Sequence, residues 1–491
     1  MKPAIWKPEA LGQVPLGSTG IRPGEAGWES YRGDVVMEGH PDLVLRPKEA
    51  KQVEEILVYA AAHKIPVTMA GGQSSLTGSS VAESGILLAT EGMQNVYDIG
   101  KDPASGETWA TVDPGIFLGD FQRAMEQEGW MYPPDPTSRN EARLGATIAT
   151  NATGEDTLYY GPTRKWVREL EVITGTGERR VFSRNGASLP AEEKATAGYY
   201  HWGDPIDLFI GSEGTLGAIT KVRVCLTPKP ASVFAGMAFF PTLELAMKFV
   251  VEARQNADLD PRALEIMDRG ALDLVGKNPE GIQWPEAAAA AIYFKQDAVD
   301  AASAGNFMEA WYAQAESVLA TSEQSELLDA LFVVEDKPGL DRLRSFRHRV
   351  PATLHEVVRG YREHGGGKIG TDWWVPYTQI GEVLTHWCEV IQSQNLQYVI
   401  FGHVGNGHPH VNFLARTGEE KEKAGKIVKA MCAEAVKRGG GVAGEHGLGK
   451  LKRDLLEIQF PQGLETMREI KNTWDPHWIL GRGNLLATPT D

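Results

Sequence analysis

The stretch Pro66–Val81, PVTMAGGQSSLTGSSV, opens as a short β-branched run and then breaks into glycine and hydroxyl residues. This composition predicts a strand that ends in a loop. A loop with few Cβ atoms can turn its N–H groups inward onto phosphate oxygens, and Ser and Thr hydroxyls add further donors. The stretch therefore predicts an anion-binding loop at the end of a strand.

Two other loops share this composition, LGATIATNATG at 144–154 and GSEGTLG at 211–217. None of the three has the spacing of a Rossmann fingerprint or of a P-loop, so neither of those sites is expected. Any one of them alone could be an ordinary tight turn. Three such loops in one half of the chain instead indicate a ligand that carries a diphosphate.

The segments around these loops predict a mixture of helices and strands. Residues 47–64 place apolar side chains at helical spacing, and a second helix is expected at 118–129, closed by Gly129. Residues 166–182 predict a hairpin. The segment 207–230 predicts a strand, the third glycine loop, another strand and a proline-rich exit that marks a domain boundary.

Beyond that boundary, alternating strand and helix patterns predict a second α+β region. The glycine-rich segment 362–370, REHGGGKIG, is expected to be a surface loop. Residues 419–441 and 464–486 predict two C-terminal amphipathic helices, each followed by a turn that contains glycine.

Size and composition exclude several classes of protein. A chain of 491 residues predicts two or three domains. The formal charge of −16 argues against a nucleic-acid partner. Three distant cysteines fit a reducing compartment. The start lacks the apolar region of a secretory signal, and no run is long enough for a transmembrane segment, so a cytoplasmic location is expected.

The stretch 402–413, GHVGNGHPHVNF, crowds three histidines into eight positions. In a strand, residues two apart face the same way, so His408, His410 and Asn412 are expected to face one cavity, with His403 folded back toward them. Imidazoles, together with a carboxylate from GEHGLG, form a plausible zinc or manganese site. The alternative is a polar turn that leads into a strand, and the residues alone leave it open.

These motifs resemble a known family. PVTMAGGQSSLTGSSV, VDPGI, YPPDPTS, LGATIATNATG, YGPT and DLFIGSEGTLGAIT look like the FAD-binding domain of FAD-linked oxidases of the vanillyl-alcohol oxidase type. FGHVGNGHPHVN, GGGVAGEHGLGKLK and WDPHWILGRGNLL look like the signatures of its D-lactate, D-2-hydroxyglutarate and glycolate dehydrogenase branch. The resemblance spans about residues 40 to 488.

The resemblance implies an α+β, two-domain flavoprotein. It assigns 1–229 to an FAD-binding domain, 230–440 to a substrate or cap domain with an antiparallel sheet, and 441–491 to a C-terminal segment that returns to the FAD domain. It also implies which residues contact FAD: Ala70, Gly71, Gly72, Gln73, Ser74, Ser75, Thr77, Gly78, Pro134, Asp135, Thr137, Ser138, Gly145, Thr147, Asn151, Gly154, Tyr160, Gly211, Glu213, Gly214, Thr215, Ile219 and Asn484.

Gln73 stands where relatives with covalent flavin carry a histidine, so FAD is expected to be held non-covalently. The resemblance also implies a divalent metal, with zinc first and manganese or iron as alternatives. Its implied ligands are His403, His410 and Glu445.

The remaining implied roles concern the substrate. His446 takes the place of the general base, and Asn412 that of the asparagine near the substrate. Arg347, four residues before Pro351, is the expected carboxylate clamp, with Arg344 and Arg349 as nearby alternatives and Lys368 as a second cation.

Asn406 and His408 replace a family Asp and Asn. His408 either adds a metal ligand or redirects substrate preference. Of the pair Trp373 and Trp374, which hints at a bulkier substrate, one is expected to be core.

The predicted reaction is FAD-dependent oxidation of a D-2-hydroxy acid to the 2-keto acid, by hydride transfer to flavin N5 with assistance from the metal and a histidine. Two alternatives remain: an oxidase of aromatic or sugar alcohols on the same scaffold, and an electron-transferring flavin subunit of a complex. The expected partners are a hydroxy-acid substrate, an electron acceptor (electron-transfer flavoprotein, quinone, cytochrome or oxygen) and a second copy in a candidate homodimer.

Overall fold

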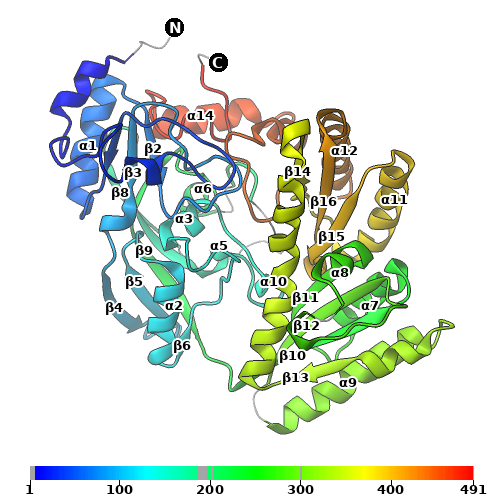
Figure 1. Cartoon of the computed structure of the whole chain (residues 1–491). Helices are drawn as coiled ribbons and strands as arrows, with labels where there is room; N and C mark the ends of the chain where they lie inside the picture. Colours follow the sequence, from blue (N-terminus) through cyan, green and yellow to red (C-terminus); the bar gives the residue numbers. More distant parts are fainter. Residues whose placement is uncertain are drawn as a thin grey trace. The chain divides into compact units, whose positions relative to one another are not determined.

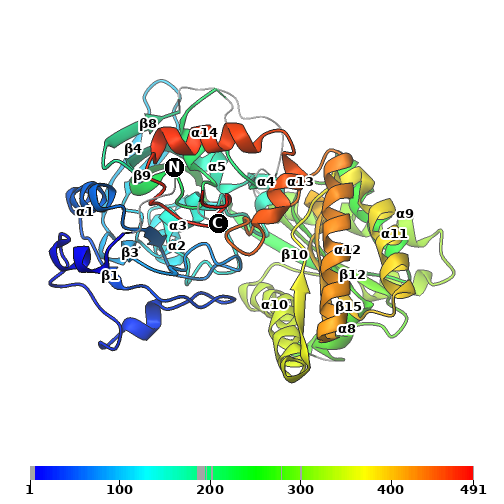
Figure 2. The same cartoon turned by 90° about the horizontal axis from the view of Figure 1, so that it is seen from above.

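The computed structural model describes residues 6–184, 194, 196–200, 203–277, 279–298 and 301–489 (Figures 1 and 2). The chain divides into two compact units. The first combines 1–154, 161–229 and 443–491, and the second combines 155–160 and 230–442. Among the described helices, none joins the length and the apolar character that crossing a bilayer requires.

A small parallel sheet begins the first unit. Its strand order is β1-β3-β2, and both pairings are parallel. Its strands are β1 (Leu43–Leu45), β2 (Val67–Ala70) and β3 (Ile86–Ala89). The helix α1 (Ala50–His63) buries Val53, Ile56 and Leu57 in a core shared with these strands, and Figure 1 shows it beside β2 and β3. The helix expected from the 3.6-residue spacing is therefore confirmed.

A larger antiparallel sheet completes the first unit. Its order is β4-β5-β9-β7-β8, with β6 also paired to β9. The bounds of its strands are β4 (Val96–Lys101), β5 (Thr108–Val112), β6 (Trp130–Met131), β7 (Val167–Thr174), β8 (Arg179–Ser183) and β9 (Gly217–Pro228). The predicted hairpin is β7–β8. Besides α1, the helices of this unit before the C-terminal segment are α2 (Leu118–Gln127), α3 (Leu144–Ala149), α5 (Thr163–Trp166) and α6 (Ile206–Phe209).

Two sequence expectations are corrected here. The segment Ile206–Phe209, IDLF, is the short helix α6 rather than a strand, and Pro205 before it already has helical backbone angles (φ −59°, ψ −22°). Four residues are too few for the spacing of apolar side chains to distinguish a helix from a strand. Part of the second glycine loop is likewise helical, as α3.

The C-terminal segment packs within the first unit. It contains α13 (Leu456–Gln459) and α14 (Leu464–Trp474). The Trp474 ring lies against those of Phe182 and Phe209. Val67 N donates to Ile479 O (2.7 Å), so the end of the chain adds hydrogen bonds to the edge of the parallel sheet.

The second unit is built on one seven-stranded sheet. Its order is β13-β10-β12-β11-β15-β16-β14, and every pairing is antiparallel. The strands are β10 (Ser232–Phe240), β11 (Pro261–Asp268), β12 (Ala290–Ala298), β13 (Phe332–Val334), β14 (Gly365–Gly370), β15 (Tyr398–His403) and β16 (His408–Thr417). The helices are α4 (Thr157–Tyr160), α7 (Leu243–Gln255), α8 (Arg269–Val275), α9 (Ala301–Leu319), α10 (Lys337–Arg359), α11 (Ile380–Ser393) and α12 (Gly418–Lys437).

Helices cover both faces of this sheet. Leu343 and Phe346 of α10 pack with Met237 and Tyr293 in one core. On the other face, Trp311 of α9 stacks on Phe294 with ring centroids 4.2 Å apart. Figure 2 shows α10 and α9 on opposite sides of the strands. The antiparallel sheet expected for this region is therefore confirmed.

Segment 365–370, expected to be a surface loop, is instead the edge strand β14, paired with β16. Ladder hydrogen bonds use only backbone atoms, so a glycine-rich segment can form a strand when its neighbour provides a partner. Nothing in the local pattern signals that partner.

Candidate active site

The three glycine loops converge in the first unit. An added Cβ on Gly71 would lie 2.6 Å from Ala146 Cβ, and one on Gly72 would lie 1.7 Å from Glu141 O. The second loop (144–154) and the third loop (211–217) are joined because Glu213 N donates to Ala149 O (2.8 Å). Only glycine allows the first loop to approach the second so closely.

The converged loops fit a diphosphate. Among the described residues, the backbone N–H groups of 72–76 have no hydrogen-bond acceptor, and the buried hydroxyl of Ser80 has no partner. Gln73 stands in the left-handed region (φ 51°), and its side chain donates to Gly33 O (3.0 Å). A run of backbone N–H groups that have no acceptor within the protein can bind an anion. These residues would hold the pyrophosphate of FAD.

The proline-rich segment around Asp135 and the start of α3 also lie in close contact with neighbouring backbone. An added Cβ on Gly154 would lie 2.0 Å from Asp135 O, and one on Gly145 would lie 2.4 Å from Pro114 Cβ. Asn151, with φ 48°, accepts a hydrogen bond from Arg164 N (2.9 Å). The implied flavin residues of loops one to three therefore lie close to one another. Tyr160 belongs to α4 of the second unit, where its hydroxyl donates to the Asp297 carboxylate, and its assignment to the flavin stays a prediction.

The C-terminal segment holds the loops together. Asn484 Nδ2 donates to Ser79 O (2.8 Å) and to Glu213 O (3.0 Å), which joins loops one and three. The Glu213 carboxylate accepts from Leu448 N and Gly449 N, both at 2.8 Å. Burial raises the pKa of Glu213 to about 7. Glu213 and Asn484 were predicted site residues, but the role of the backbone at 448–449 was missed.

Lys450 is another residue that the sequence did not single out. Its Nζ donates to Gly78 O (3.3 Å) and to Asn484 Oδ1 (3.0 Å), and burial lowers its pKa to about 8. Its position in GEHGLGKLK, next to a glycine run, is the only local signal. The Lys450 side chain thus places a cation at the first glycine loop.

The histidine motif forms the connection between β15 and β16. The turn is the 3₁₀ segment Val404–Asn406, followed by Gly407 at φ 66°, where a Cβ would lie 1.9 Å from Val375 O. The ring centroids of His403, His408 and His410 are 4.7–5.7 Å apart, and all three side chains are buried. The structure thus gathers the three imidazoles, as the alternation along the strand predicted.

Each imidazole of this cluster has an oxygen partner. His403 Nδ1–H donates to Glu265 Oε1 (2.6 Å), His408 Nε2–H to Asp372 Oδ1 (3.1 Å) and His410 Nδ1–H to Thr371 O (3.3 Å). Histidines that bind metals are usually held in this way through their other nitrogen. Glu265 and Asp372 were missed because they lie 138 and 36 positions away from their partners.

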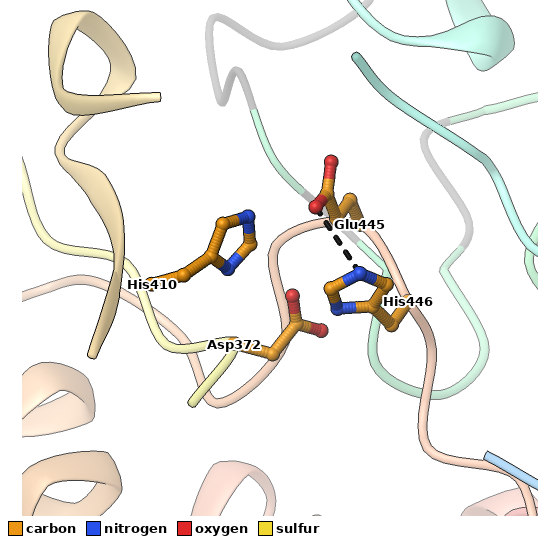
Figure 3. A group of neighbouring side chains, drawn as sticks. All are labelled: Asp372, His410, Glu445 and His446. Atoms are coloured by element: carbon orange, nitrogen blue, oxygen red, sulfur yellow. Dashed lines mark ion pairs between the residues drawn. The ribbon is translucent and has the colours of Figure 1, made fainter. Parts of the chain in front are cut away.

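Figure 3 draws Asp372, His410, Glu445 and His446, side chains that offer imidazole or carboxylate donors to a metal. In the second unit, Asp372 and His410 offer ligand atoms within 4.8 Å of each other. In the first unit, Glu445 Oε1 and His446 Nε2 lie 3.2 Å apart. Mixed imidazole and carboxylate donors suit zinc, manganese or iron. The chemistry of the donors therefore fits the implied metal.

Arg347 is mostly buried, with its side chain 12% exposed, and it is already paired. Its Nε donates to Glu265 Oε2 (2.8 Å), its Nη2 lies 2.5 Å from the same oxygen, and its Nη1 is 3.9 Å from Glu155 Oε2. Although burial alone would raise the pKa of Glu265, Arg347 and His403 hold it below its ordinary value. Arg347 thus contacts His403 through Glu265, and its assignment as a substrate clamp stays a prediction.

Lys368 and Asn412 lie together at the edge of the sheet. Gly370 of β14 pairs with Asn412 of β16, and a Cβ on Gly370 would lie 2.9 Å from Asn412 Oδ1 and 3.4 Å from Lys368 Cε. The missing side chain at 370 therefore leaves a space that both groups line. Of the tryptophan pair, Trp373 is core, with no exposed surface.

Comparison with known proteins identifies the family. Residues 229–485, more than half of the chain, match the C-terminal domain of FAD linked oxidases, and residues 41–183 match an FAD binding domain. The chain belongs to the FAD-linked oxidases. The predicted family, fold class and flavin-dependent oxidoreductase are confirmed.

Relatives of this FAD-linked oxidase span almost its whole length. It is 28% identical to the glycolate oxidase subunit GlcD of Bacillus subtilis over 464 residues (93% of this chain, 92% of the relative). It is 30% identical to a D-lactate dehydrogenase of Archaeoglobus fulgidus over 446 residues (90% and 91%). It is 28% identical to a D-2-hydroxyglutarate dehydrogenase of Stutzerimonas stutzeri over 466 residues (91% and 91%).

Solved structures share the fold of this FAD-linked oxidase. The 4-ethylphenol oxidase of Gulosibacter chungangensis has a TM-score of 0.70 at 15% identity, over 100% of this chain and 99% of that one. An alkyldihydroxyacetonephosphate synthase has a TM-score of 0.68 at 16% identity, over 98% and 85%. At these identities the likeness concerns the fold alone.

Proposed function

We propose that this FAD-linked oxidase converts a D-2-hydroxy acid to the 2-keto acid, with FAD held non-covalently and with one divalent metal. The single observation that carries the proposal is the buried cluster of three histidines at the turn between β15 and β16. The names of the relatives, which include glycolate, D-lactate and D-2-hydroxyglutarate enzymes, support the same substrate class.

The chain's own residues divide the work. FAD, held by the glycine loops, would supply the acceptor for the α-hydrogen as a hydride, and a metal held by His403, His410 and Glu445 would polarise the hydroxyl and carboxylate oxygens of the substrate. His446 removes the hydroxyl proton. Because its Nε2–H faces Glu445 Oε1 (3.2 Å), Nδ1 is the nitrogen that we assign as the base. His403, His410 and Glu445 are the proposed metal ligands.

The substrate carboxylate needs a cation in this acidic protein. We assign it to Lys368, with Asn412 beside it, and retain Arg347 as the second candidate. Lys368 is half-buried. Arg347 donates to Glu265 and stands near Glu155. A substrate carboxylate at Arg347 would be a third anion around one guanidinium. This comparison favours Lys368.

The alternative, an aromatic or sugar alcohol substrate, has slight support from the tryptophan pair and from Asn406 and His408. Trp373 is core, as expected of one of the pair, and Trp374 is half-buried. The histidines together with Glu445, and Arg347, favour a hydroxy acid instead. We expect the electron acceptor of the reduced flavin to be an electron-transfer flavoprotein, a quinone, a cytochrome or oxygen, and the assay can use an artificial acceptor.

The test is reduction of the protein's flavin under anaerobic conditions by a panel of D- and L-2-hydroxy acids and of aromatic and sugar alcohols. We expect bleaching of the flavin absorbance by at least one D-2-hydroxy acid and none by its L enantiomer. Purified protein without flavin, or flavin bleached only by an alcohol that has no carboxylate, would contradict the proposal.

A further inference from the structure

Lys450 lies where the returning C-terminal segment packs on the first glycine loop. Lys450 N and Leu451 N both donate to Thr77 O, at 3.0 and 3.1 Å. A Cβ on Gly449 would lie 2.3 Å from the same oxygen, so the two backbones are in contact. All of these residues belong to the first unit. The backbone thus holds the Lys450 side chain beside the last part of the loop.

The Lys450 ammonium is desolvated without an ion pair. Its Nζ donates to Gly78 O (3.3 Å) and to Asn484 Oδ1 (3.0 Å), which are both neutral oxygens. No carboxylate oxygen of the described residues lies within 4.0 Å of it. An ammonium carries three N–H donors, so one donor and the charge have no partner in the part of the chain that the structure describes. Because a desolvated charge is costly unless it is paired, this arrangement favours an anionic ligand at Nζ.

The end of the loop near Lys450 has no backbone donor to offer such an anion. The N–H groups of 72–76 have no acceptor among the described residues, but Gly78 N already donates to Asp34 Oδ2 (2.9 Å). The free amides therefore stop before Gly78. Lys450 Nζ, which donates to Gly78 O, is the donor that remains at this end.

Acidic side chains surround Lys450. Asp34, Glu83 and Glu213 act on its charge, together with the cation Arg453. A phosphate group bound at this loop would be repelled by the three carboxylates, and the Lys450 ammonium offsets that repulsion. Burial lowers the pKa of Lys450 to about 8, so the amine is still mostly protonated at pH 7.

We propose that Lys450 binds the pyrophosphate of FAD through the third N–H of its ammonium, at the end of the first glycine loop. This inference rests on the proposed function, because the FAD held non-covalently there is its ligand. It adds a full positive charge to a cradle that otherwise consists of backbone amides and hydroxyls. It also gives the returning C-terminal segment a direct contact with the cofactor.

The experiment measures the affinity of the full-length protein for FAD rather than turnover. Serial dilution of the flavin-loaded protein releases FAD, and the fluorescence of the released FAD gives its dissociation constant at pH 7. The variants are Lys450→Met, Lys450→Gln and Lys450→Arg. The matched control is Lys452→Met, because it removes the same charge from the same segment and the Lys452 side chain has no hydrogen bond or ion pair with the described residues.

We expect Lys450→Met to weaken FAD binding by about 10–100-fold, the usual cost of losing a hydrogen bond to a charged group. Lys450→Gln should lose as much, because it keeps N–H donors for Gly78 O and Asn484 Oδ1 but not the charge. Lys450→Arg should recover most of the loss, and Lys452→Met should bind FAD like the wild type.

FAD affinity in Lys450→Met equal to that of the control overturns the inference. So does wild-type affinity in Lys450→Gln, because Lys450 then acts only by bridging Gly78 and Asn484. If Lys450→Met is insoluble, the order of Lys450→Gln and Lys450→Arg decides, and equal affinities overturn the inference. Insolubility of all three variants also overturns it, because a residue that only binds the cofactor leaves the fold intact.

The two proposals fail separately. Wild-type flavin that a D-2-hydroxy acid bleaches, in a protein that binds FAD equally well without Lys450, leaves the proposed function standing and removes this inference. FAD binding that depends on the charge of Lys450, in a protein whose flavin no hydroxy acid bleaches, does the reverse.

Discussion

Arg347 and Lys368 show how differently two cations in one unit are held. Arg347 donates to Glu265 and lies near Glu155, both of which are buried acids. Removing one partner of a buried ion pair leaves a charge in a medium that solvates it poorly. Lys368 lies on the edge strand β14 and is only half-buried. The first residue should therefore matter for folding, and the second for binding.

The substitutions Arg347→Met and Lys368→Met separate these roles. Arg347→Met should lower the free energy of unfolding by about 3–5 kcal/mol, because Glu265 and Glu155 lose their cation. Lys368→Met should leave unfolding almost unchanged and raise the KM for the hydroxy acid at least tenfold. Denaturant unfolding and steady-state kinetics measure the two effects. A stable Arg347→Met protein with a raised KM would restore Arg347 as the carboxylate clamp.

Glu213 predicts a pH dependence of stability. Burial raises its folded-state pKa to about 7 from an ordinary 4.5, so the folded protein holds this proton more tightly than the unfolded chain. The contribution to stability is complete below about pH 4.5 and is lost as the pH rises toward 7, by at most about 3 kcal/mol. Glu213→Gln removes the titrating group.

The measurement is the thermal unfolding midpoint of the flavin-loaded protein between pH 4.5 and 8. The unfolding midpoint of the wild type minus that of Glu213→Gln should fall as the pH rises across this range. Parallel curves would show that the folded-state pKa of Glu213 is ordinary.

At the scale of elements, the first glycine loop depends on close approach to the segment before α3. A Cβ on Gly72 would stand 1.7 Å from Glu141 O, a backbone atom that cannot rotate away. Gly72→Ala should therefore displace the loop and lower the flavin content of the purified protein at least tenfold. Gly12→Ala is the matched control, because nothing lies within 4 Å of the added Cβ. The flavin-to-protein absorbance ratio measures the flavin content of both variants. An unchanged ratio in Gly72→Ala would contradict the assignment of the first glycine loop to FAD binding.

Elements with a strong period were predictable from the sequence, and those defined by a distant partner were not. The apolar spacing of α1 gave its buried face residue by residue. The short helix α6 and the glycine-rich strand β14 have no such period. The first follows a proline in helical conformation, and the second is a strand only because β16 pairs with it.

The same reason limits prediction of the site. Histidines 403, 408 and 410 were found because they stand in one motif on neighbouring strands. Their carboxylate partners, Glu265 and Asp372, come from β11 and from the segment after β14, and no local pattern connects them to the motif.

At the scale of the whole molecule, the chain returns to its first unit after the second is complete. Residues 443–491 belong with the N-terminal unit, and they supply Asn484, Lys450 and the backbone amides that hold the three loops. The candidate base, His446, lies in the same returning segment. The second unit is therefore a long insertion, 230–442, in the chain of the first. Cofactor binding is assigned to residues before and after this insertion, and proton transfer to His446 after it.

The most direct test of the account is the rate of flavin reduction by the best D-2-hydroxy acid in His446→Asn, measured by stopped-flow absorbance under anaerobic conditions. Loss of the base should slow reduction by about 10²–10⁴-fold, the usual contribution of such a group, while flavin and metal contents stay at wild-type values. Flavin reduced at the wild-type rate in this variant would contradict the account.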